Sequence, residues 1–207
     1  MALINDTERQ QIADAIAEVE RHTDAELVAV LAARSDDYRY IPVLWAALAA
    51  LTVPTIGLFT PYGADVIAAT QLAVFCVLTL VFRVPPIATR LIPRGVRHWR
   101  AANMARRQFL EQGLHHTEGD TGVLLFVSEA EHYVEILADR GVDRHVAPER
   151  WRGLVDDFVL AVRTGKTLGG FESTISQIGE ILAEVVPKTA DNRNELDNRL
   201  ILLGYDD

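Results

Sequence analysis

The sequence has little cysteine and little lysine, and it lacks the common signatures of enzyme active sites. Its one cysteine, Cys76, cannot form an intramolecular disulfide, which agrees with a reducing compartment. Two lysines stand beside 18 arginines, a bias typical of a GC-rich bacterial genome. No P-loop, dinucleotide fingerprint, H-E-x-x-H motif or cysteine pair is present, and Ser128 does not lie in a G-x-S-x-G context. No catalytic constellation can therefore be named.

Charged side chains are absent from two long apolar runs, residues 41–60 and 66–82, with the polar turn 61–65 between them. Because a helix rises about 1.5 Å per residue, roughly 20 residues span the hydrocarbon core of a bilayer and 17 lie at the lower limit. Proline and glycine in the first run disfavour a helix in water but are frequent in membrane helices. We expect a two-helix transmembrane hairpin; a buried or re-entrant helix pair is the alternative.

The distribution of arginine predicts the orientation of this hairpin. Seven arginines and no acid lie between Arg83 and Arg107, and Arg34 and Arg39 precede the first run. The turn carries only Asp65. Because positive charge near span ends marks the cytoplasmic side, we expect a multi-pass protein of the cell (inner) membrane, with both termini and the soluble domain in the cytoplasm.

The same arginines predict a partner. Arginines beside a span attract anionic lipid headgroups, so we expect residues 83–107 to contact the lipid bilayer. The rest of the chain has a net charge of −16, which would repel nucleic acid, and nucleic acid is not expected as a partner. Small residues in the stretch 46–50 allow close helix contact. A membrane-protein partner or a homo-oligomer through the spans is therefore left open.

The remaining periodicity predicts three strands and four amphipathic helices, which is typical of an α/β sandwich. A capping box, Thr7 to Gln10, would begin the first helix. The expected strands are 27–32, 122–128 and 132–138, the last two antiparallel, and the later helices run from 94 to 112, from Pro148 to Gly165 and from about 171 to 186. The fold class is thus α/β, a small sheet flanked by helices and interrupted by the hairpin. The expected divisions are 1–40 and 98–190 (the domain), 41–82 (the hairpin), 83–97 (a basic juxtamembrane segment) and 191–207 (a tail).

Several ordered segments resemble the TPM domain family. They are residues 20–30, 107–109, 113–117, 121–128 and 134–141. The family's Gly-aromatic-Gly-x-Glu pattern corresponds to residues 139–143, where Gly141 and the acid Asp143 match. The resemblance implies an α/β sandwich, often tethered to a membrane, in a bacterial branch that contains the hairpin. Some members of this family have acid phosphatase activity, and some bind calcium through acidic loop residues. The resemblance therefore implies both properties as expectations for this chain.

Acidic side chains at the expected strand ends are the candidate metal ligands. Asp139 and Asp143 follow the third strand, Asp120 precedes the second, and Glu26, close to Asp24, leads into the first. If these ends converge, the carboxylates suit Ca²⁺ or Mg²⁺, which take oxygen ligands. The alternative is turn capping on a solvated surface, since Asp favours turns and Arg140 is an exposed ion-pair partner.

Two functions follow from these expectations. The first is a membrane-tethered interaction or assembly and maintenance module on the cytoplasmic face. The alternative is a metal-dependent acid phosphatase anchored to the membrane. The sequence names neither a substrate nor a protein partner.

Overall fold

The computed structural model describes residues 4–84, 87, 90–189, 196 and 198–205. Within it the chain forms two compact units, one from residues 1–35 and 98–207 and the other from residues 36–97. The first unit contains the sheet and most of the helices. The second contains the two apolar runs.

The first unit is built around a four-stranded mixed sheet with the strand order β3-β2-β1-β4. Strands β1 (Leu27–Ala32), β2 (Val123–Ser128) and β3 (Tyr133–Ala138) have the positions expected from the sequence. β1 and β2 are parallel, with Val30 opposite Phe126, whereas β2 and β3 form the expected antiparallel pair. Every residue of β1 and β2 is buried, which explains why both strands are apolar apart from Ser128 at the end of β2.

The fourth strand, β4 (Leu200–Leu203), corrects the expectation of three strands, because it pairs in parallel with β1. Its four apolar residues fall in the range 191–207, for which the sequence predicted a tail and no strand. They are too few to show the alternation that identifies a strand in a sequence. β4 therefore lies within the segment expected to be a tail.

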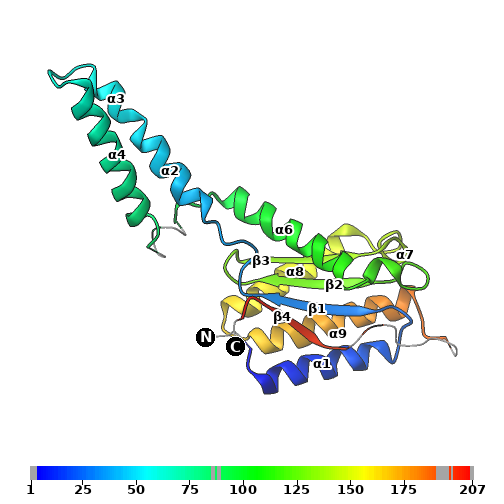
Figure 1. The fold of residues 1–207 in the computed structure, drawn as a ribbon. Helices are drawn as coiled ribbons and strands as arrows, with labels where there is room; N and C mark the ends of the chain where they lie inside the picture. Colours follow the sequence, from blue (N-terminus) through cyan, green and yellow to red (C-terminus); the bar gives the residue numbers. More distant parts are fainter. Residues whose placement is uncertain (1–3, 85–86, 88–89, 190–195, 197, 206–207) are drawn as a thin grey trace. The chain divides into compact units, whose positions relative to one another are not determined.

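Helices cover both faces of the sheet (Figure 1). One face packs against α1 (Asp6–Glu20), α8 (Pro148–Arg163) and α9 (Thr167–Val185). The other face packs against α6 (Arg94–Glu111), which belongs to the first unit from His98 onward. Short helices η1 (Leu114–His116) and α7 (Arg140–Asp143) lie in the connections. This arrangement confirms the α/β fold class.

The start of α1 differs from the expectation in one detail. Asn5, not Thr7, is the N-cap residue, and its side chain accepts a hydrogen bond from the Glu8 backbone N–H at 2.9 Å. The Glu8 carboxylate accepts in return from the Asn5 N–H at 2.8 Å, which completes a capping box. Asn is as good a capping residue as Ser or Thr, and here it lies two residues earlier.

The second unit consists of α2 (Tyr40–Ala50), α3 (Thr52–Gly57) and α4 (Ala64–Val81). The first apolar run is thus divided at Leu51. Pro54 explains the break, because it has no N–H to donate to the Ala50 carbonyl. Both candidate spans, Tyr40–Gly57 and Ala64–Val81, are 18 residues long and apolar enough to cross a membrane, by length and composition alone.

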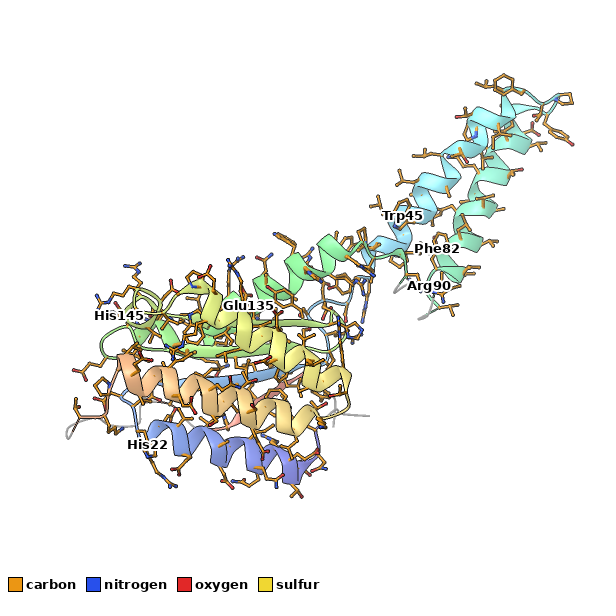
Figure 2. The ribbon with its side chains drawn as sticks, turned by 180° about the vertical axis from the view of Figure 1, so that it is seen from behind. His22, Trp45, Phe82, Arg90, Glu135 and His145 are labelled. Carbon is orange, nitrogen blue, oxygen red and sulfur yellow. The ribbon has the colours of Figure 1, made fainter. Side chains whose placement is uncertain are left out.

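Side chains project outward along α2 and α4 (Figure 2, where Trp45 labels α2 and Phe82 follows α4). No residue of α4 is buried. The base of the unit is more compact: Tyr38, Ile41 and Ile92 form a small cluster. The Trp45 indole N–H donates to the Leu91 carbonyl at 3.1 Å.

Candidate functional site

Two of the loops that were expected to carry metal ligands contact each other through their backbones. The Gly141 N–H donates to the Asp120 carbonyl at 2.8 Å, and the Asp139 N–H donates to the Gly122 carbonyl at 2.9 Å. Gly119 and Asp120 both have left-handed backbone conformations, with φ of 78° and 56°. The acids at 120, 139 and 143 therefore belong to one loop cluster beside the start of β2.

Gly141 leaves no room for a side chain in this cluster. A Cβ atom at this position would lie 2.2 Å from the Gly119 carbonyl oxygen and 2.6 Å from the Asp120 carbonyl oxygen. Both atoms belong to the backbone, so neither can rotate away. The glycine shared with the TPM pattern is thus required by the close approach of two loops.

The carboxylates of the cluster do not converge. Asp139 caps α7 and accepts a hydrogen bond from the Arg140 N–H at 2.7 Å, while Asp120 and Asp143 are exposed. Glu26 is buried at the start of β1. In the described part of the chain, no group of three or more His, Cys, Asp or Glu side chains is arranged to hold a metal ion. A Ca²⁺ or Mg²⁺ site at these acids stays a prediction from the sequence.

A pair of buried carboxylates lies between the end of α1 and the start of β1. Glu20 is 8% exposed and Glu26 is 3% exposed. The Leu27 N–H donates to Glu20 Oε1 at 3.0 Å. Burial, together with the charge of Glu26, raises the pKa of Glu20 from 4.5 to about 7, against the opposing effects of the Leu27 and Asn198 hydrogen bonds and of Lys188.

The segment after α9 binds this turn through hydrogen bonds and an ion pair. The Lys188 ammonium group donates to the carbonyl oxygens of Glu20 and Thr23 at 3.1 and 3.3 Å and lies 3.6 Å from the Asp24 carboxylate. Thr189 donates to Asp24 through both its N–H and its hydroxyl group. Asp24, considered as a metal partner in the sequence, is thus bound to the chain itself.

Sequence reasoning missed Glu20, although a signal was present. Ile12, Ile16 and Glu20 follow each other at intervals of four residues, so the carboxylate falls on the apolar stripe of α1. An acid on such a stripe indicates a buried carboxylate.

Glu20 makes stability depend on pH. Because its pKa of about 7 in the folded protein exceeds the ordinary 4.5, the folded state holds this proton more tightly than the unfolded chain. This contribution is complete below pH 4.5 and is lost as the pH rises through 7. At roughly 1.4 kcal/mol per pKa unit, burial of the charged carboxylate costs about 3 kcal/mol above pH 8. Because burying an amide in its place costs about 1 kcal/mol at every pH, Glu20→Gln should stabilise the protein by about 2 kcal/mol above pH 8 and destabilise it by about 1 kcal/mol below pH 4.5.

Urea unfolding of the detergent-solubilised chain at a series of pH values measures this difference. Glu180→Gln is the matched control, because Glu180 is exposed on α9. If the difference in the free energy of unfolding between the wild type and Glu20→Gln does not change with pH, this result contradicts a raised pKa of Glu20.

The opposite end of β1 and β2 holds a second buried carboxylate. Glu131 is 2% exposed. It accepts hydrogen bonds from the Ser128 hydroxyl and from the Ser35 N–H, the latter at 3.0 Å, and the two serine hydroxyls lie 2.8 Å apart. Ser35 is the residue at which the chain leaves the first unit. Ser128 is only 1% exposed, so a substrate cannot reach its hydroxyl group. We therefore interpret this network as structural: it fixes the backbone at the point where the chain leaves the first unit.

An open groove of about 310 Å³ lies between β3 and α8. Val134, Ile136, Trp151 and Val155 give it apolar walls, and its other lining residues are Glu135, Arg152 and Asp156. Figure 2 labels Glu135 on this strand. None of the four predicted metal ligands lines the groove. The groove and the acidic loop cluster are therefore separate features.

Two comparisons with known proteins agree with this architecture. Residues 87–181 match the family model of the TPM domain, a range that includes α6, β2, β3, α7 and α8. The NMR structure of the BA42 protein from the psychrophilic bacterium Bizionia argentinensis sp. nov. is similar, with a TM-score of 0.61 and 18% identity over 96% of this chain and 94% of that chain. At this identity the similarity concerns the fold. No curated protein matches.

The family match confirms the resemblance found in the segments after residue 107, whereas the segment 20–30 lies outside the matched range. With its four-stranded sheet between two helical layers, this chain resembles the TPM domain family, and the match to the family model covers residues 87–181.

Proposed function

We propose that this protein is a TPM domain tethered to a membrane by the hairpin α2–α4, and that it serves as an interaction or assembly module on the cytoplasmic face. The observation that carries the tether is the exposure of apolar side chains over the whole hairpin. Large apolar residues that are more than 50% exposed there include Leu44, Leu51, Ile56, Leu58, Phe59, Leu72, Val77 and Leu80.

Such a surface is unfavourable in water, since soluble monomers rarely expose contiguous apolar patches above a few hundred Å². In a bilayer the same side chains contact lipid. Each candidate span of 18 residues is about 27 Å long, close to the roughly 30 Å hydrocarbon core. The backbone groups of helices are satisfied internally, as a membrane requires.

The orientation is proposed from charge. Arginines flank the hairpin on the side of the domain, and the turn carries only Asp65. On this basis we propose that the turn lies outside the cell and the domain in the cytoplasm. The metal-dependent phosphatase stays an alternative that a phosphomonoester assay would test, and no arrangement among the described residues favours it.

Thiol labelling tests the topology. In a Cys76→Ala background, Tyr62→Cys places a thiol in the turn and Ser176→Cys places one on the exposed face of α9. A membrane-impermeant maleimide should label the Tyr62→Cys variant in intact bacterial cells and the Ser176→Cys variant only after permeabilisation.

The wild-type chain provides a control. Cys76 lies within α4 and should resist the same reagent until detergent is added, because the bilayer shields it. Labelling of the Ser176→Cys variant in intact cells would reverse the orientation. Wild-type labelling at Cys76 without detergent would contradict the span itself.

A further inference from the structure

We propose that the outer face of α6 is a second membrane contact, which binds anionic lipid headgroups and so holds the TPM domain against the bilayer. This inference rests on the proposed tether and names the partner of the domain. We define the α6 outer face as Trp99, Arg100, Asn103, Arg106, Arg107 and Leu110.

The position of this face follows from the packing of the helix. Ala101, Ala105 and Gln108 are the buried residues of α6. The two alanines pack against residues of the sheet. At about 100° per residue, Trp99, Asn103, Arg106 and Leu110 follow one another at four-, three- and four-residue intervals and form a stripe opposite the buried side. The stripe extends over about 16 Å of helix.

The stripe combines large apolar side chains with arginine. Trp99 is 58% exposed and Leu110 is 57% exposed. The Arg100 guanidinium lies 5.0 Å from the centre of the Trp99 ring, and Arg106 and Arg107 are exposed. Tryptophan or leucine on one face, together with basic residues, is typical of helices that lie in the interface of a membrane.

The charge of α6 is opposite to that of the chain. The helix has five arginines and a single acid, Glu111, while the whole chain has a net charge of −9. Arg107 pairs with Glu111 at 2.7 Å, and Arg106 contacts the Asn103 side-chain oxygen at 3.5 Å. The negative charge of an anionic lipid surface complements the positive charge of this helix. Arginine binds the anionic headgroups, and tryptophan is enriched at the same depth of the membrane interface.

The tether brings this face within reach of the bilayer. α6 begins 13 residues after α4 ends at Val81. A fully extended chain of this length spans at most about 45 Å. Linking the helix to the membrane raises its effective concentration at the lipid surface, so a few arginines suffice for binding.

The test uses the full chain with Cys76→Ala and Asn103→Cys, labelled with an environment-sensitive fluorophore and reconstituted in vesicles. Vesicles contain either neutral phosphatidylcholine alone or about 30% phosphatidylglycerol in addition. We expect quenching by a water-soluble quencher to fall several-fold in the anionic vesicles and to recover in about 1 M salt. The same label at Ser176→Cys on α9 should be quenched equally in both.

Arg100→Gln, Arg106→Gln and Arg107→Gln together should restore quenching in the anionic vesicles, since each arginine near an anionic surface contributes roughly fivefold. Circular dichroism checks that the triple variant keeps its helices. Equal quenching of the Asn103→Cys label in both vesicles, while the protein floats with both, overturns the lipid contact. If protection of the label from the quencher increases with the protein density in the vesicles and not with lipid charge, the lipid contact is also overturned. That result indicates that a second copy of the chain covers the α6 outer face.

Flotation separates this inference from the proposed function. Protein that fails to float with neutral vesicles contradicts the hairpin tether. Protein that floats with neutral vesicles supports the tether whatever the label at position 103 reports.

Discussion

Leu72→Asp combined with Val77→Asp is expected to release most of the protein from membranes into the alkaline carbonate wash. The two side chains are 64% and 57% exposed on α4, which has no buried residue. An aspartate at the centre of a membrane helix costs about 3 kcal/mol, and one nearer the end costs less, so the pair should oppose insertion by about 5 kcal/mol. The retained fraction is measured by immunoblotting of the washed pellet.

The matched control is Leu160→Asp, because Leu160 is equally exposed, at 61%, but lies on α8 of the TPM domain. This variant should remain in the washed membranes like the wild type. If the double α4 variant is also retained, then α4 does not face lipid and the hairpin has another partner.

Gly141→Ala is expected to lower the free energy of unfolding by at least about 3 kcal/mol, above the usual cost of overpacking. The added Cβ would overlap two backbone carbonyl oxygens, those of Gly119 and Asp120. Relief requires the loop at Gly119 to move away from α7, which would break the hydrogen bond from the Gly141 N–H to the Asp120 carbonyl. Urea unfolding of the solubilised chain measures the loss.

Gly153→Ala is the control for this substitution. Gly153 lies in the interior of α8, and a Cβ there would meet nothing within 4 Å. Alanine should therefore stabilise the protein by about 0.5–1 kcal/mol through its better helix propensity. Similar stability of both variants would show that the two loops do not approach as closely as the structure indicates.

The buried core of the domain was predictable because its strands are unambiguous. The stretches 27–32 and 123–127 are uninterrupted apolar runs, and in the structure both lie at the centre of the sheet. The helices α6 and α8 show clear apolar periodicity and end close to their expected limits. Strong local patterns of this kind agree with the tertiary structure, so local reasoning succeeds.

The candidate site was less predictable because it depends on contacts between residues that lie far apart in the sequence, and no local sequence pattern indicates such contacts. Asp24 is bound to Lys188 and Thr189, more than 160 residues away in sequence. The pairing of β4 with β1 and the burial of Glu20 also require the tertiary structure. Strand-end acids could be listed from the sequence, but whether their carboxylates converge depends on side-chain direction.

The strand order has a consequence for the order in which the protein folds during synthesis. β1 is made before the hairpin, yet its two partners are β2, which follows the hairpin, and β4, which begins only at Leu200. The first 35 residues therefore leave the ribosome without a sheet to join, and any insertion of the hairpin precedes completion of the core. Long-range pairing of this kind is slow and leaves apolar strands exposed meanwhile. The nascent β1 strand thus depends on what shields it until β4 has been synthesised.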